Sequence, residues 1–349
     1  MPDNGTANGT AKGTAQDFGQ WDGQPVPLLT IASPSGQEAR LCAFGARLVG
    51  LDAPDRDGHS ADIVLGHDRL EDYRNSYFGA TCGRYANRIA GGRFMLDSTE
   101  VQLDRNEGAN HLHGGRLGFD QMLWAVESHH AGKVVFSATS PAGDMGYPGK
   151  LRMTTTYAWD AECRFHITMT ACTTAATMVN IVNHAYFNLA GSGDILGHEL
   201  TVEAEHYLPV QPDLIPTGEI RAVAGTAFDF RTPVLIREAL MRDLSMRDGF
   251  DHNWCLNPGR VRPAVRLFHP GTGRGFTLST NEPGVQIYTC GMMTDPLPGK
   301  AGQTYGRFSG LTFETQKYPD SPNHPQFPSA RLDPAQTYQH EMIFSFFTA

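Results

Sequence analysis

The stretch "LRMTTTYAW", residues 151–159, alternates large or apolar side chains with smaller or polar ones at every second position. The segment "RFHITMTA", residues 164–171, repeats the pattern with Phe165, Ile167, Met169 and Ala171. A period of two puts each set of side chains on one face of an extended chain. Each stretch therefore predicts a half-buried β-strand.

Similar short runs recur along the chain, separated by turn clusters that draw on 38 Gly and 22 Pro. The further strands that we expect are "LLTIAS", "RLCAF", "KVVFSAT", "AVRLFH", "GFTLST", "VQIYTC", "LTFETQ" and "HEMIFSFF". Helical spacing is rare. It occurs in residues 234–248, where Leu235, Leu240 and Leu244 would share a helix face, and in the shorter segment 70–75. The sequence predicts an all-β, antiparallel sandwich or large sheet pair with few short helices.

Composition narrows the possible partners. The formal net charge of the 349 residues is −9, without a Lys/Arg cluster, which argues against a nucleic-acid or membrane surface. The six cysteines form no CxxC pair, and no 18-residue apolar window occurs, so we expect a cytoplasmic protein with reduced thiols. Residues 1–16, rich in Gly-Thr units, are expected to form a flexible tail, and residues 17–349 a single domain.

Five segments are more polar or glycine-rich than a scaffold requires. They are "GRYANRIAGGRF" (83–94), "NHLHGG" (110–115), "NHAYFNLAG" (183–191), "DGFDHNWCL" (248–256) and "GLTFETQKYPDSPNHPQFP" (310–328). In the first, Asn87 and Arg88 offer hydrogen-bond donors beside glycines that let a ligand approach the backbone. Taken singly, each feature also has an ordinary structural explanation: a histidine packed in the core, or an Arg88–Asp251 ion pair.

Two other site chemistries remain open from the residues alone. His111 and His113 would share a face if extended, and His184, Glu314 or Asp251 could complete a metal site, although the glycine pair after His113 favours a loop. A carboxylate pair such as Glu314 with Asp251 could cleave glycosides. Nucleophilic hydrolysis is disfavoured because the chain has no GxSxG motif.

Together, the five segments resemble the aldose 1-epimerase, or galactose mutarotase, family. The resemblance rests on "GRYANRIAGGRF", "LHGG", "NHAYFNLAG", "FDHNWCL" and "ETQKYPDSPN", in this order and spacing, and extends from about Phe18 to the C-terminus. The chain departs from the family pattern at Met178 and Val182, where the family commonly has Pro and Thr, and in its Gly-Thr tail. The two departures bear on local packing or substrate preference.

The resemblance implies a β-sandwich of the galactose mutarotase type (a supersandwich), with its site on a concave sheet face and with neither cofactor nor metal. The implied reaction interconverts the α and β anomers of a free hexose such as galactose or glucose. Glu314 would be the general base, His184 the general acid at the ring oxygen, and His113 would assist there. The implied sugar-binding residues are Asn87, Arg88, Asp251, Gln286 and Tyr186. We expect a monomer or homodimer, and the alternative function is a non-catalytic carbohydrate-binding or sugar-sensing module on the same fold.

These side chains suit the implied chemistry. Opening the sugar ring requires removal of the anomeric hydroxyl proton and protonation of the ring oxygen, and a carboxylate and an imidazole can exchange these roles. If residues 180–188 form one strand, His184 shares a face with Asn180, Tyr186 and Asn188. A phosphorylated sugar would call for more cationic donors than Arg88 alone, so we expect a free sugar.

Overall fold

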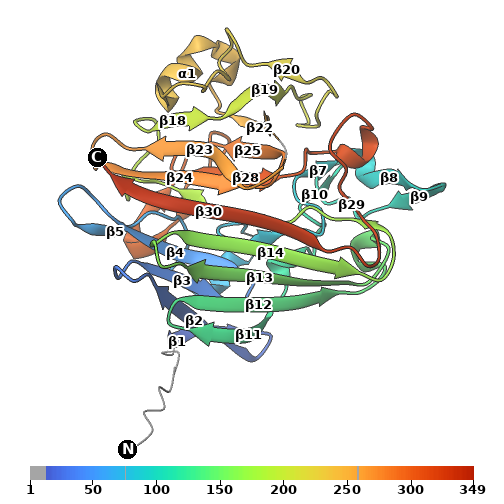
Figure 1. Ribbon diagram of the computed structural model, residues 1–349, viewed down its shortest axis with the longest axis horizontal. Helices are drawn as coiled ribbons and strands as arrows, with labels where there is room; N and C mark the ends of the chain where they lie inside the picture. The colour runs from blue at the N-terminus through green and yellow to red at the C-terminus, as the bar shows by residue number, and fades with distance from the viewer. Residues whose placement is uncertain (1–12, 75, 258) are drawn as a thin grey trace, which may run out of the picture.

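The computed structural model describes residues 13–74, 76–257 and 259–349 (Figure 1). The described residues hold one α-helix, α1 (Ile236–Arg242), amid many strands, and all strand pairs in the sheets are antiparallel. The expected all-β sandwich with few short helices is therefore confirmed. In the described part of the chain, no helix has both the length and the apolar character needed to cross a membrane.

The largest sheet has nine strands. In spatial order they are β11 (Ala125–His130), β12 (Lys133–Ser140), β13 (Leu151–Trp159), β14 (Phe165–Thr173), β30 (Tyr338–Thr348), β24 (Arg274–Thr280), β23 (Arg262–Phe268), β18 (Glu199–Val202) and β21 (Val234–Leu235). Burial alternates along β13 and β14 as their sequences predict, with the larger or apolar set buried in each. The period-two pattern therefore identified the face that packs inward.

A six-stranded sheet carries most of the polar segments. Its order is β17 (Tyr186–Phe187), β28 (Leu311–Gln316), β25 (Gly284–Tyr288), β22 (Asp251–Leu256), β19 (Ala204–Leu208) and β20 (Arg221–Ala222). Phe187 and Phe313 from this sheet meet Phe276 and Phe344 from the nine-stranded sheet, with ring centroids 5.2 Å (Phe187–Phe276) and 5.7 Å (Phe276–Phe313) apart. This aromatic cluster joins the two sheets, so one face of β28 belongs to the core and the other faces away from it.

A five-stranded sheet, β1 (Thr14–Trp21), β2 (Gln24–Ala32), β3 (Glu38–Cys42), β4 (Arg47–Pro54) and β5 (Ser60–Asp62), completes the large sheets, near β11 and β12 in the lower part of Figure 1. Residues 14–16 pair with residues 28–30, so they belong to an edge strand and not to the expected tail. The strand is anchored by Trp21, which stacks on Phe44. The rest of the expected tail, residues 1–12, lies outside the described residues.

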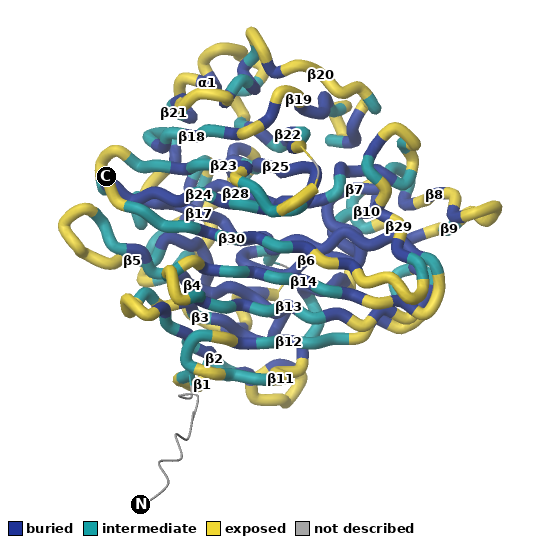
Figure 2. The backbone as a smooth tube through the Cα atoms, in the orientation of Figure 1, coloured by how far each residue is buried: buried dark blue, intermediate teal, exposed yellow. Residues whose placement is uncertain are grey.

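Short strand pairs and turns make up most of the remainder. The pairs are β6 (Thr81–Cys82) with β16 (Val182–Asn183), β7 (Arg88–Ile89) with β10 (His111–Leu112), β8 (Arg93–Leu96) with β9 (Thr99–Gln102), β15 (Thr177–Met178) with β29 (Arg331–Leu332), and β26 (Leu297–Pro298) with β27 (Thr304–Tyr305). The 3₁₀ turns are η1 (Leu70–Tyr73), η2 (Ala90–Gly92), η3 (Phe119–Gln121), η4 (Asp144–Gly146), η5 (Leu244–Met246), η6 (Lys300–Gly302) and η7 (Ser321–Asn323). Figure 2 shows burial concentrated in the central strands and exposure in the peripheral turns.

The long helix expected over residues 234–248 is wrong in its extent. Residues 234–235 are the edge strand β21, α1 ends at Arg242, and a separate 3₁₀ turn follows. Of the three leucines expected on one face, Leu240 is buried but Leu244 is 82% exposed. Strand pairing with β18 overrides the helical spacing at the start.

Candidate active site

Glu314 projects from the face of β28 that points away from the aromatic cluster. On this face Glu314 lies directly opposite Gln286 of β25, which in turn lies opposite Asn253 of β22. Thr312, two residues before Glu314, donates a hydrogen bond to its Oε1 at 3.1 Å. The result is a polar row across the sheet. All four of its side chains are buried, namely those of Asn253, Gln286, Thr312 and Glu314.

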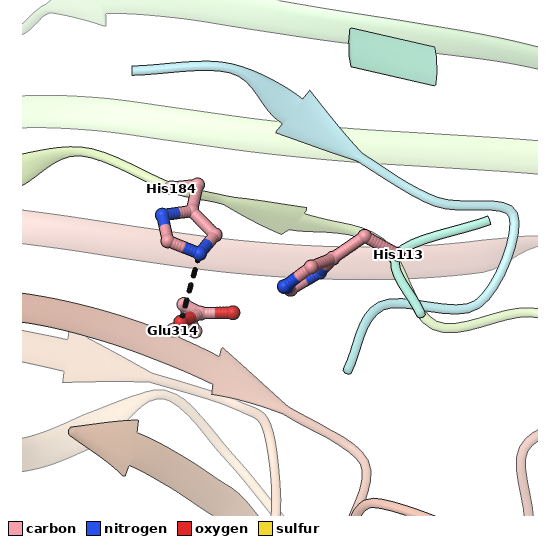
Figure 3. Close-up of side chains that lie close together, drawn as sticks. All are labelled: His113, His184 and Glu314. Carbon is pink, nitrogen blue, oxygen red and sulfur yellow. Dashed lines mark ion pairs between the residues drawn. The ribbon is translucent and has the colours of Figure 1, made fainter. Parts of the chain in front are cut away.

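His184 is held over this row by a short segment between β16 and β17. Its backbone N–H donates to the carbonyl of Ala80 at 2.8 Å, and its carbonyl accepts from the N–H of Gly79 at 3.0 Å. These bonds direct the imidazole toward Glu314, with Nε2 3.3 Å from Oε1 (Figure 3). A strand and a loop that are far apart in sequence thus bring the predicted acid and base into contact.

The expected strand face of His184, Asn180, Tyr186 and Asn188 is wrong, because two separate short strands flank His184. Asn180 donates to the carbonyl of Ala86, and Asn188 donates to the carbonyl of Ser309, so both amides tie backbone segments together. Only Tyr186 stays beside His184, with ring centroids 5.0 Å apart.

His113 approaches the same place from the loop after β10. Its backbone has φ of 50°, and its Nδ1 accepts the N–H of Asn87 at 3.2 Å, which leaves the proton of a neutral imidazole on Nε2. Gly114 makes the approach possible: its φ is 95°, and a Cβ there would collide with the carbonyl of Gly83. The glycine in "LHGG" therefore positions a histidine.

His111 lies in a different environment from His113. Its Nδ1 is 2.6 Å from the carbonyl oxygen of Asp104, and its Nε2 is 2.7 Å from the hydroxyl of Tyr147. Both ring nitrogens are thus engaged away from the site, and the pair does not form a shared ligand face. The residues that do converge are His113, His184 and Glu314, whose potential ligand atoms lie within 4.8 Å of one another. This set has the residue types and spacing of a metal site as well.

Arg88, Asp251 and Gln286 form the next part of the site. Gln286 Nε2 donates to Asp251 Oδ1 at 2.6 Å, and Arg88 Nη1 is 3.8 Å from Asp251 Oδ2. The anticipated Arg88–Asp251 pair is therefore present but long. Asn87, with φ of 59°, contributes its backbone to His113 and its Oδ1 to the N–H of Arg88. All eight residues implied by the resemblance lie in this region of the fold.

Burial shifts the titration of the central groups. It raises the pKa of Glu314 to about 8, with the charge of Asp251 acting in the same direction, and lowers the pKa of His184 to about 4. The pKa of His113 is lowered well below its ordinary value, first by burial and then by the charge of His184. Between about pH 4 and 8, Glu314 and His184 together hold one titratable proton, and the two atoms that can exchange it, Glu314 Oε1 and His184 Nε2, are 3.3 Å apart.

Two buried oxygens in this row have no hydrogen-bond partner among the described residues: Glu314 Oε2 and Gln286 Oε1. Buried polar atoms are nearly always paired, so each marks a place where a ligand hydroxyl can bind. Both oxygens belong to the outward face of the six-stranded sheet. The arrangement combines a mobile proton with acceptors for hydroxyl groups.

Sequence reasoning missed two residues of this site, Tyr77 and Glu107. Tyr77 packs against both histidines, with ring centroids 4.8 Å from His113 and 5.5 Å from His184. Glu107 accepts two hydrogen bonds from Arg88. Tyr77 lies only six residues before the polar segment 83–94, a proximity that could have identified it, whereas nothing in the sequence around Glu107 indicates its contact with Arg88.

The two departures from the family pattern are packing positions. Met178 is buried in a small apolar cluster with Tyr85 and Ile89, and Val182 is buried with Cys82 and Ala86. Neither side chain belongs to the converging polar set described above. Their structural role is consistent with the local packing effect that we expected.

Comparisons with known proteins identify the family. The family model described as aldose 1-epimerase matches residues 27–345. Galactose mutarotase of Bos taurus is 44% identical over 314 residues, covering 88% of this chain and 91% of that protein, and aldose 1-epimerase of Escherichia coli K12 is 35% identical over 93% and 96%. The crystal structure of an aldose epimerase homologue from C. elegans superposes with a TM-score of 0.86 at 28% identity, covering 96% of this chain and 100% of that one. This chain belongs to the aldose 1-epimerase family.

Proposed function

We propose that the chain interconverts the anomers of a free aldohexose such as galactose or glucose, using the single proton held by Glu314 and His184. An aldose 1-epimerase is an isomerase, and its reaction leaves the composition of the sugar unchanged. The observation that carries the assignment of roles is the contact of 3.3 Å between Glu314 Oε1 and His184 Nε2, beside the unpartnered Glu314 Oε2. We assign this oxygen as the acceptor of the anomeric hydroxyl proton.

Ring opening follows from this proton count. The proton of the pair first passes from Glu314 to His184 across their 3.3 Å contact. Ionised Glu314 then takes the proton from O1 while His184 delivers its proton to the ring oxygen, and the C1–O5 bond breaks to give an aldehyde. Rotation about C1–C2 and reversal of both transfers closes the ring as the other anomer. No proton is gained or lost over the cycle, so the pair returns to its starting state.

The neighbouring groups would orient the sugar. His113, neutral with its proton on Nε2, can donate to the ring oxygen and stabilise the negative charge that this oxygen gains as the C1–O5 bond breaks. Arg88 can donate to sugar hydroxyls, while Asp251 and Gln286 can accept from them. Tyr186, beside His184, would pack against the sugar. These roles divide the site into a proton-transfer end and a hydroxyl-recognition end.

Polarimetry tests the proposal. The optical rotation of freshly dissolved α-galactose and α-glucose should relax faster with the protein than without it, to the same final value. Addition of EDTA should leave the rate unchanged, because imidazole and carboxylate supply the acid and base. Sugar binding without faster relaxation would instead support a carbohydrate-binding module, and a rate abolished by EDTA would support the metal alternative.

A further inference from the structure

The guanidinium of Arg88 lies between two carboxylates that it contacts unequally. Its Nε and Nη2 each lie 2.6 Å from one oxygen of Glu107, in a two-bond pair, whereas Nη1 is 3.8 Å from Asp251 Oδ2. The side chain of Glu107 is 36% exposed and that of Asp251 14%. The two short hydrogen bonds thus join Arg88 to the more exposed Glu107, and the long contact joins it to the more buried Asp251.

This inequality leaves Asp251 available. Its Oδ1 accepts from Gln286, and a distance of 3.8 Å to Nη1 is beyond a hydrogen bond, so Oδ2 retains capacity for a ligand hydroxyl. Attraction between opposite charges strengthens as solvent is excluded, which draws Arg88 toward the more buried carboxylate. Glu107 supplies the opposing attraction that keeps the guanidinium from closing the gap.

The loop that carries Glu107 is itself firmly held. Glu107 and Asn110 exchange backbone hydrogen bonds of 3.2 and 2.9 Å, and the side chain of Asn106 both donates to the carbonyl of Leu112 and accepts from its N–H. Asn110 Oδ1 also accepts the N–H of Gly91, close to Arg88 in the chain. Ordinary exposed ion pairs contribute little because two flexible side chains must be ordered, but here the backbone already positions the carboxylate.

We propose that Glu107 is a positioning residue for sugar recognition. It holds the Arg88 guanidinium away from Asp251, so that Arg88 Nη1 donates to, and Asp251 Oδ2 accepts from, hydroxyls of the aldose. The proposal rests on the proposed function, in which the sugar occupies this face of the sheet. Because Glu107 bonds to Arg88 and not to the Glu314–His184 pair, its effect falls on sugar affinity and not on proton transfer.

The test compares Glu107→Gln with Glu219→Gln. Glu219 forms a similar two-bond pair with Arg221, at 2.8 and 2.6 Å, but on an exposed turn, so it is a matched control. With α-galactose, Glu107→Gln should raise KM about tenfold, the equivalent of one charge-assisted hydrogen bond, and keep kcat within about twofold. Glu219→Gln should change neither. Glu107→Asp, which keeps the charge on a shorter side chain, should recover part of the affinity.

A second arm asks whether Glu107 acts through Arg88. In an Arg88→Met background, Glu107→Gln should raise KM no further. The inference is overturned if Glu107→Gln has the wild-type KM, if its loss appears in kcat, or if the loss persists in full in the Arg88→Met background. Thermal unfolding checks the fold of each variant, and if Glu107→Gln unfolds, a wild-type KM in Glu107→Asp overturns the inference. If the wild-type protein accelerates the relaxation of optical rotation of neither sugar, the proposed function is refuted, and this result is distinct from the outcomes above.

Discussion

The difference in stability between Glu314→Gln and the wild type should shift in favour of the variant as the pH rises. The pKa of Glu314 is raised from 4.5 to about 8 by burial, so the folded protein favours the protonated form more than the unfolded chain does. As pH rises from 4.5 to 8, the wild type progressively loses the stability that this preference provides. Glu314→Gln does not titrate and escapes the loss.

The magnitude follows from the two pKa values. One pKa unit corresponds to about 1.4 kcal/mol. Relative to a carboxyl that stays protonated in both states, the titration of Glu314 lowers the free energy of unfolding of the wild type by about 1 kcal/mol at pH 5 and by about 3 kcal/mol at pH 7. The free energy of unfolding of Glu314→Gln minus that of the wild type should therefore be about 2 kcal/mol larger at pH 7 than at pH 5. Any cost of the amide itself is independent of pH and cancels in this difference.

Urea unfolding at pH 5 and pH 7 measures this gain. His184, whose folded pKa of about 4 lies below its ordinary 6.5, destabilises both proteins as the pH falls, so its contribution cancels when they are compared. Glu100→Gln, at an exposed position of β9, is the control and should show no such gain. Equal differences between Glu314→Gln and wild type at both pH values would refute the raised pKa of Glu314.

Three further predictions concern activity. The pH profile of kcat/KM should be bell-shaped, falling below about pH 4, where Glu314 and His184 both carry protons, and above about pH 8, where neither does; activity undiminished at pH 9 would contradict this count. Replacing His113 with Gln should lower kcat roughly tenfold by polarimetry, the worth of one hydrogen bond to the ring oxygen, and an unchanged kcat would remove His113 from the reaction. Gly114→Ala should lower both the unfolding temperature and kcat/KM, whereas Gly225→Ala, also at positive φ but with open space for a Cβ, should spare kcat/KM; equal behaviour of the two would refute the steric argument.

The strands were predictable from the sequence because alternation is a local property. Every second side chain of β13 and β14 is buried, and strands were found in all the other expected runs. The errors occurred where tertiary pairing decided the outcome. The polar segment from Thr14 joins the edge of β2, and Leu235 pairs in an edge strand instead of beginning a helix.

The site was only partly predictable. The resemblance selected residues that the fold does bring together, such as Glu314 and His184, but their contact depends on how a loop crosses a sheet. The spacing of His111 and Asn188 could not predict that both side chains bind backbone carbonyls instead of joining the site. The Glu107–Arg88 pair likewise required the relative placement of two loops, which local sequence does not encode.

The most direct test of the shared proton is a double-mutant cycle on kcat for α-galactose at pH 7. Each of Glu314→Gln and His184→Gln should lower kcat by about 10² or more, and the double variant should lose no more than the worse single one, because the two side chains act as a unit. Wild-type kcat in either single variant, or losses that multiply in the double variant, would contradict proton exchange between these two groups.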